Sequence, residues 1–421
     1  MPEPKRKWWR KLDNAAKVFP STVKKSDTRV FRFSAFLHED VEPTALQAAV
    51  DAAITEFPIF LSVMRRGVFW YYLEQSDIKP VIEMENKPPC YPMYDSDKKS
   101  LLFTVSYFKS KINLEVYHVL TDGTGAIAFL KAILYYYIKI THAADFECDF
   151  PIMPGSAMEQ KSADGFSKYY RKRRIKRTRN LKAHILKGTH LSGNGLRIVN
   201  ADMSVSALSA IAKSHNASIT ELLTAIFILA IHDNMSLHEC RKPIVIGVPV
   251  NLRKYFPSDT ARNFFGLISV SYNFDKSSDD ISEIIRTVRE TFKDKLTPEK
   301  LSERMDVLIA LEHNAGIRIA PLPIKNFAIR TARGLADTET TAVISNVGII
   351  SMPDGFERYI KSFGVYASTL KTQLCFCSYK DTLTLGISSA FESPWLEREF
   401  ISRITECGIE VSISANHIGE E

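Results

Sequence analysis

The sequence has no uninterrupted apolar run of about 18 or more residues, the length that a membrane-spanning helix requires. Its N-terminus is charged and lacks the apolar core of a secretory signal. The six cysteines are scattered, form no CxxC pair and join no histidines in a metal-ligand pattern, so neither a disulfide framework nor a zinc site is indicated. These absences predict a reduced protein in the cytoplasm that holds no metal.

Phosphate-binding glycine loops are also missing. The sequence contains neither a G-x-x-x-x-G-K-S/T loop nor a G-x-G-x-x-G loop after a strand. Nothing therefore indicates nucleotide hydrolysis or dinucleotide redox chemistry. We therefore expect no bound cofactor.

The excess positive charge is confined to one segment. The net charge is +7, but residues 168–187 alone carry ten Lys or Arg and no acid. The rest of the chain is slightly acidic, so the fold has no extended basic surface of the kind that binds nucleic acid, and we expect no nucleic-acid partner. The segment fits a solvated connector, a contact with the phosphates of CoA, or a weak contact with nucleic acid or an acidic membrane surface.

The length and composition indicate two folded halves. A chain of 421 residues with 45% hydrophobic residues exceeds what one core usually organises. Each half mixes strands with amphipathic or buried helices, and no short-period repeat occurs. We predict an N-terminal half over residues 1–165, a basic linker over 166–190 and a C-terminal half over 191–421.

The strongest candidate for chemistry is HVLTDG, residues 118–123, between a predicted strand and a predicted helix. Alternation along INLEVYH places His118 on the face that Leu114 and Val116 share, at the end of the strand. The partial positive charge at a helix N-terminus favours neutral imidazole, the form that a general base needs. The alternative is a core histidine followed by Asp122 as the cap of a helix beginning near Thr124.

Five blocks in order carry a resemblance to a known superfamily: LDNAAKVFPS, EFPIFLSVMRRGVFWYYLE, HVLTDGTGAIAFLKAI, VPVNLRKYFPSDTARNFFG and ISNVG. The chain resembles the chloramphenicol acetyltransferase superfamily, which includes condensation domains, and within it the bacterial alcohol acetyltransferase-like group. The resemblance implies an α/β fold of two acetyltransferase-like subdomains, each a mixed sheet flanked by helices. These would form a V-shaped cleft with a central tunnel.

The resemblance also implies roles for particular residues. His118 would be the general base, with acyl-CoA as co-substrate and no acyl-enzyme. Asp122 would point away from the substrate and pair with Arg253, and Gly123 would allow close approach of substrate and backbone.

Four further residues are candidates with an open alternative. Ser345 and Asn346 would contact the oxyanion of the tetrahedral intermediate, or else form an ordinary strand-end turn before Gly348. Asn263 and Gly266 would shape the cleft, or else merely cap a loop.

Two departures from related families bear on which acyl donor and which acceptor the chain uses. Tyr117 stands where condensation domains carry a second histidine, which favours free acyl-CoA over a carrier-bound thioester, and the DFGWG block of the plant enzymes is absent. We predict an acyl-CoA-dependent O-acyltransferase acting on a small alcohol, with no obligate protein partner. The alternatives are an N-acyltransferase acting on an amine, a condensation-type enzyme using a carrier-bound thioester, a non-enzymatic basic binding protein, and an inactive scaffold. The sequence determines neither the acyl chain length nor the acceptor.

Overall fold

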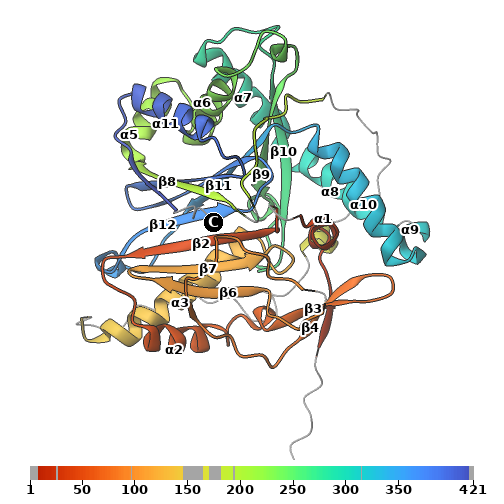
Figure 1. The fold of residues 1–421 in the computed structure, drawn as a ribbon, viewed down its shortest axis with the longest axis vertical. Helices are drawn as coiled ribbons and strands as arrows, with labels where there is room; N and C mark the ends of the chain where they lie inside the picture. The colour runs from red at the N-terminus through yellow and green to blue at the C-terminus, as the bar shows by residue number, and fades with distance from the viewer. Residues whose placement is uncertain are drawn as a thin grey trace, which may run out of the picture.

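The computed structural model describes residues 8–24, 27–95, 97–145, 165–169, 182–192, 195–313 and 315–416. It is a mixed α/β fold in which helices cover two large sheets, one below the other in the view of Figure 1. Most of the basic segment 168–187 and Cys148 lie outside the described residues.

The lower sheet has five strands in the order β12-β2-β7-β6-β5. Helices α2 and α3 lie on the side of this sheet that faces away from the upper sheet (Figure 1). Alternating apolar residues fix the register, in which Phe31, Phe33 and Ala35 of β2 pair with Val116, Leu114 and Ile112 of β7. The bounds are β2 Val30–Leu37, α2 Pro43–Ala53, β5 Glu83–Met84, β6 Phe103–Phe108, β7 Lys111–Tyr117, α3 Gly123–His142 and β12 Ile360–Ala367.

The upper sheet has seven strands in the order β10-β9-β11-β13-β14-β8-β15. The buried helix α6 begins at a capping box of the S-x-x-E type, in which Ser218 and Glu221 exchange hydrogen bonds with each other's backbone. The bounds are β8 Arg197–Ser204, α5 Val205–Ser214, α6 Ile219–His232, β9 Ile244–Asn251, β10 Phe265–Tyr272, α7 Ile281–Lys295, β11 Ala342–Ile349, β13 Thr372–Tyr379, β14 Thr382–Ser389, α11 Trp395–Glu406 and β15 Ser412–Ala415.

Strand β12 crosses between the two halves. It belongs to the C-terminal part of the chain, yet it pairs antiparallel with β2 and lies against β13 and β14. Residues 350–367 accordingly contribute to the core of the lower sheet. The predicted C-terminal half over residues 191–421 thus supplies one strand to the lower sheet. Pairing between strands that are far apart leaves no local mark in a sequence, so this exchange could not be predicted, and the division into two halves stays a prediction.

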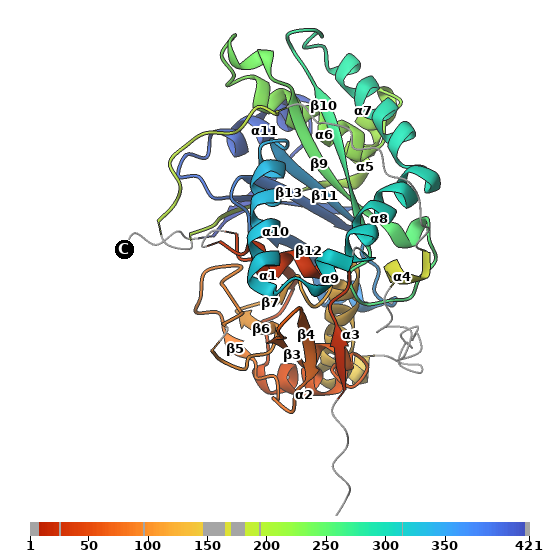
Figure 2. The same cartoon turned by 90° about the vertical axis from the view of Figure 1, so that its right-hand side faces the viewer.

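A third, small sheet has the order β1-β4-β3 and lies beside a group of helices (Figure 2). The tip of its β3–β4 hairpin contacts the first turn of α10, where the Leu322 amide donates to the Val68 carbonyl over 2.9 Å. The bounds are β1 Trp9–Lys11, α1 Phe19–Thr22, β3 Ser62–Arg66, β4 Tyr71–Gln75, α4 Gly165–Tyr169, α8 Pro298–His313, α9 Ala315–Ile319 and α10 Leu322–Asp337.

The buried apolar residues form two clusters, one for each large sheet. Strand β13 contributes to both, because Cys375 and Cys377 face the lower core while Leu374 and Phe376 face the upper one. The two cysteines thus lie on one face of the strand, as the two-residue alternation in TQLCFCSY requires. Cys90, Cys240, Cys375, Cys377 and Cys407 are free thiols.

Within the described residues, no single helix is long and apolar enough to cross a membrane. One pair, α5 with α6, passes such a test by composition, but the two helices meet at 80°.

Candidate active site

The turn between β7 and α3 is shaped by Asp122, which caps the helix. One carboxylate oxygen, Oδ1, accepts the backbone N–H groups of Thr124 at 3.1 Å and Gly125 at 3.2 Å. An N-terminal Asp satisfies amides that have no partner within the helix. Asp122 thus caps α3, as the alternative interpretation of the motif expects, but it does so with only one of its two carboxylate oxygens.

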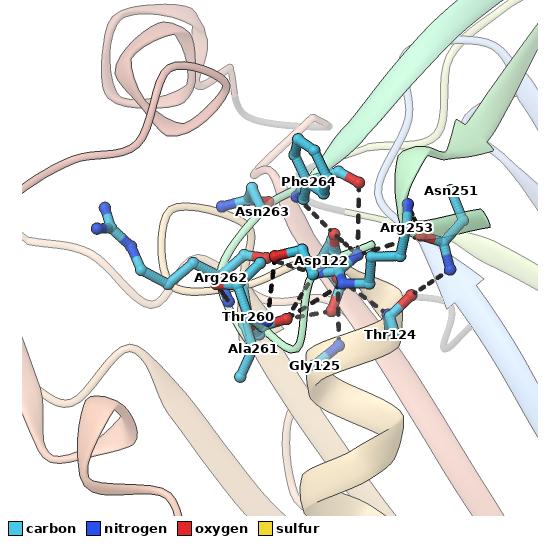
Figure 3. A network of polar contacts seen from close by, with 12 residues as sticks. Asp122, Thr124, Gly125, Asn251, Arg253, Thr260, Ala261, Arg262, Asn263 and Phe264 are labelled. Carbon is cyan, nitrogen blue, oxygen red and sulfur yellow. Dashed lines mark hydrogen bonds and ion pairs between the residues drawn. The ribbon is translucent and has the colours of Figure 1, made fainter. Parts of the chain in front are cut away.

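The other oxygen of Asp122 connects α3 to the C-terminal half. Oδ2 accepts the Arg253 guanidinium at 2.8 Å and the Phe264 amide at 2.8 Å (Figure 3). The Asp122 and Arg253 side chains are only 6% and 11% exposed, so water does not screen the pair appreciably. Arg253 and Asp122, the pair that the resemblance implies, therefore form a buried ion pair.

Arg253 also fixes the shape of the loop over residues 260–264. Its Nε and Nη2 donate to the Thr260 carbonyl at 3.1 and 2.9 Å, and Nη2 donates to the Arg262 carbonyl at 2.6 Å. The planar guanidinium suits such convergent contacts. Asn251 adds a second link to α3, because its Nδ2 donates to Thr124 Oγ1 at 3.2 Å.

Gly125 permits the close approach of this loop to α3. A side chain there would overlap the Ala261 carbonyl and Thr121 Oγ1, which are themselves hydrogen-bonded to each other. At Gly123 an added methyl group would meet only Phe33, at an ordinary 3.7 Å. Packing within the chain therefore requires glycine at position 125 and permits alanine at position 123.

The imidazole of His118 is held from the opposite half of the chain. Its Nδ1 lies 3.0 Å from Asn263 Oδ1, while Asn263 Nδ2 donates to the His118 carbonyl at 3.0 Å and to Asp13 Oδ2 at 3.1 Å. Both partners of this amide nitrogen are acceptors, which fixes the orientation of the Asn263 amide. The oxygen thus faces Nδ1, and the network assigns the ring proton to Nδ1 and a free lone pair to Nε2 of neutral His118.

The surroundings of His118 favour the neutral ring. Phe19 stacks on it at 4.6 Å between centroids, and Phe31 and Phe265 lie at 4.9 and 5.4 Å. Burial lowers the pKa of His118 because it disfavours the imidazolium, and the nearby Asp122 and Asn263 only partly oppose this. Among the described residues, Nε2 makes no hydrogen bond.

Ser345 and Asn346 lie on β11, beyond the point where this strand leaves β9. The two strands pair only at Ala342 and Val343. Asn346 is exposed and donates to Thr220 Oγ1 at 2.9 Å, and it accepts the Gly348 amide at 2.8 Å within a bulge. In the described part of the chain neither residue hydrogen-bonds to His118, so their proposed contact with an oxyanion stays a prediction.

Gly266 occupies a regular position in β10, opposite Val250 of β9. A methyl group there would contact Leu252 at 3.4 Å, so the strand does not depend on glycine. Asn263, by contrast, is fully buried and contacts His118 directly.

Three residues of the site were not singled out in the sequence. Asp13 and Phe19 lie in the first resembling block, LDNAAKVFPS, and Gly125 follows the motif by two residues. A buried acid inside an apolar segment is the one local sign that Asp13 has a specific partner. No group of three or more His, Cys, Asp or Glu placed to hold a metal occurs among the described residues.

No model of a known protein family and no curated protein matches the chain. Solved structures do match over nearly its whole length. The trichothecene 15-O-acetyltransferase TRI3 from Fusarium sporotrichioides aligns with a TM-score of 0.62 at 11% identity, covering 96% of this chain and 95% of that one. TRI101 from F. graminearum, complexed with coenzyme A and T-2 mycotoxin, aligns with a TM-score of 0.64 at 10% identity, covering 96% and 99%.

The first condensation domain of the CDA synthetase aligns with a TM-score of 0.60 at 11% identity, covering 95% of this chain and 96% of that one. The chain therefore shares the two-lobed α/β fold of these acetyltransferase and condensation-domain structures, and the predicted fold class is confirmed. The likeness to the bacterial alcohol acetyltransferases and the open tunnel stay predictions.

Proposed function

We propose that the chain is an acyl-CoA-dependent O-acyltransferase in which His118 acts as general base. The observation that carries the proposal is the hydrogen bond from His118 Nδ1 to Asn263, whose orientation is fixed by Asp13 and the His118 carbonyl. It leaves Nε2 of a half-buried imidazole as the free basic atom. The fold is shared with an acetyltransferase and with a protein whose structure contains coenzyme A and a mycotoxin, which supports this reaction class.

In this mechanism both substrates meet at Nε2. The nitrogen takes the proton of the acceptor hydroxyl as its oxygen attacks the thioester carbonyl carbon. The tetrahedral intermediate then breaks its carbon–sulfur bond, and the imidazolium returns the proton to the departing thiolate. The products are an ester and free CoA thiol, and His118 is again neutral.

Asp122 and Arg253 act as positioning residues in this proposal. Their ion pair fixes the start of α3 and the loop that carries Asn263, and no step requires either to exchange a proton. Gly123, Ser345 and Asn346 stay candidates for stabilising the oxyanion, and a cytoplasmic location remains part of the proposal.

The test measures thiol release from acetyl-CoA with a panel of small alcohols and amines. We expect an alcohol to support turnover, and we expect His118→Ala to lower it about a hundredfold or more, the usual loss when a positioned base is removed. A folded His118→Ala variant that keeps near wild-type thiol release would reject this role for His118. An amine that outperforms every alcohol would favour an N-acyltransferase instead.

A carrier-bound thioester is the second candidate donor, because the fold is equally that of a condensation domain. The same assay, run with an acyl group on a phosphopantetheinylated carrier protein, separates the two donors. Tyr117 in place of the second motif histidine favours the free CoA ester.

A further inference from the structure

Helix α10 places its apolar residues on the outside. Ile324, Phe327 and Leu335 are 61%, 73% and 66% exposed, and their spacing puts them on one face of the helix. A surface helix normally turns its apolar face inward. Here three large apolar residues lie on the outward face instead, and the helix lies at the surface in Figure 2.

The inward face of α10 carries the buried Leu322 at its start and otherwise polar residues, whose contacts hold the helix in this orientation. Lys325 is buried, with Nζ 3.0 Å from the Phe69 carbonyl and 3.5 Å from the centre of the Trp70 ring. Asn326 accepts a hydrogen bond from Ser21 of α1 at 2.7 Å, and Arg330 donates to the Ser21 carbonyl at 2.9 Å. Rotating the helix to bury its apolar face would break all of these contacts.

Neighbouring elements extend the exposed apolar face. Ile319 of α9 is exposed, as are Val68 and Phe69 at the tip of the β3–β4 hairpin, which contacts the first turn of α10. We call Val68, Phe69, Ile319, Ile324, Phe327 and Leu335 the α10 surface. Apolar residues gathered in this way mark an interaction site, unlike single exposed apolar residues such as Leu237.

The charge around the α10 surface is positive. Residues 315–337 contain four basic residues, Arg318, Lys325, Arg330 and Arg333, and one acid, Asp337. Asp337 is already paired with Arg333 at 2.9 Å. Lys325 is buried on the inward side, so the positive charge beside this face comes from Arg318 and Arg330, which are exposed. An apolar helix face bordered by basic residues is the pattern that binds anionic lipid surfaces.

We propose that the α10 surface docks the protein on an anionic lipid membrane, with Ile324, Phe327 and Leu335 inserted among the lipid headgroups. A second copy fits this face less well, because it would bring two like-charged surfaces together. The chain's own basic segment 168–187 is disfavoured as a cover for the same reason. The docking goes beyond the proposed acyl transfer and does not depend on it.

The α10 surface lies close to the candidate active site, with only helix α1 between them. Helix α1 packs between α10 and His118, since Ser21 contacts α10 while Phe19, two residues earlier, stacks on the imidazole. If acyl transfer is established, an acceptor drawn from the membrane would therefore arrive close to the base.

The experiment is vesicle sedimentation with the full-length protein and no substrate. Vesicles of phosphatidylcholine alone are compared with vesicles that also contain phosphatidylglycerol, at low and high salt. We expect binding to the anionic vesicles that weakens as salt screens the basic residues. The triple variant Ile324→Ser, Phe327→Ser, Leu335→Ser should bind about tenfold more weakly or worse, because it loses the apolar area that enters the membrane.

Leu237→Ser is the matched control, because it removes an exposed apolar side chain from a different surface; it should bind as the wild type does. Thermal unfolding shows whether each variant is folded. We expect every variant to fold, because the substituted side chains are exposed. Absence of wild-type binding would overturn the proposal. Undiminished binding by the triple variant would also overturn it, and would indicate that the basic segment 168–187 binds the vesicles instead. A wild-type dimer that the triple variant loses, without vesicle binding, would overturn it in favour of a second copy. Thiol release with soluble acceptors reports on the proposed function separately.

Discussion

At the scale of single residues, His118 combines a lowered pKa with a fixed tautomer. Burial among Phe19, Phe31 and Phe265 disfavours the imidazolium, so the pKa of His118 lies below its usual value. We therefore expect kcat/KM to be independent of pH near neutrality and to fall on acidification, with an apparent pKa below about 6.5. An acid limb centred well above that value would contradict the assignment of His118 as the base.

The same burial has a consequence for stability. The unfolded chain takes up a proton on His118 more readily than the folded chain, so the unfolded state binds more protons as the pH falls below the unfolded pKa. The contribution of neutral His118 to the free energy of unfolding is complete above that value and is lost below it.

Nitrogen NMR of histidine-labelled protein, with His118→Ala to assign the signal, should show a protonated Nδ1 and a bare Nε2 at neutral pH.

Gly123 and Gly125 offer a comparison of two glycines two residues apart. Gly125→Ala should lower the free energy of unfolding by about 1–3 kcal/mol, because the new methyl group overlaps a backbone carbonyl that cannot rotate away. Gly123→Ala should unfold at or above the wild-type temperature, since its methyl group makes only an ordinary 3.7 Å contact with Phe33 and alanine favours the helix. The measurement is thermal unfolding of both variants.

This comparison also tests why glycine stands at position 123. A stable Gly123→Ala variant that has lost thiol release would indicate that substrate approaches the backbone there. Equal destabilisation by the two substitutions would contradict the packing argument.

At the scale of elements, the start of α3 and the 260–264 loop are joined by the Asp122–Arg253 ion pair. Breaking a buried pair from one side leaves an unpaired charge, and we expect Asp122→Asn and Arg253→Ala each to cost about 3–5 kcal/mol and to impair activity. The double variant should be little worse than either single one, because both remove the same interaction. A double-mutant cycle by denaturant unfolding and by thiol release measures this.

The control for the cycle is a surface pair. Glu83 and Lys87 lie 3.8 Å apart and are each 57% exposed, so their alanine variants should have small and additive effects. Additive losses at Asp122 and Arg253 as well would reject the coupling.

The elements differ in how well the sequence predicts them. Helix α3, the capping box of α6 and the strand alternation of β13 follow from local patterns, and all three are present. Helix α10 was not predicted, since Ile324, Phe327 and Leu335 face outward while the polar Lys325 faces inward. Its orientation depends on contacts with Ser21 and Phe69, which lie far away in the sequence.

The candidate site shows the same division. The motif from His118 to Gly123 is continuous in the sequence, and its geometry as a strand–turn–helix could be predicted. The contact with Asn263 and the position of Asp13 behind it could not, because these residues come from three separate segments. Asn263 was a candidate on resemblance alone, with a loop cap as the alternative.

At the scale of the whole molecule, the candidate site lies where the two cores meet. His118 and Asp122 follow a strand of the lower sheet, whereas Arg253, Asn263 and Phe265 come from the upper sheet and the loop beside it. Strand β12 joins the two sheets a second time. We infer that the site forms only when both halves are folded, so its integrity is a property of the complete chain.

Among the residues that the structure describes, this arrangement places no activated nucleophile beside His118. Burial raises the pKa of the thiols of Cys90 and Cys377, and that of Cys375 to about 12, which disfavours the thiolate that a covalent route would need. The hydroxyl of Thr121 already donates to the Ala261 carbonyl. We therefore expect direct attack within a ternary complex.

Direct attack should give intersecting lines in initial-rate plots against the two substrates, whereas a covalent acyl-enzyme should give parallel lines. Mass spectrometry provides an independent check on the protein after incubation with acyl-CoA alone. An acyl adduct on Cys, Ser or Thr that acceptor removes at the catalytic rate would overturn the direct mechanism. Slow labelling of surface lysines would not, because such an adduct does not turn over and so cannot lie on the reaction path.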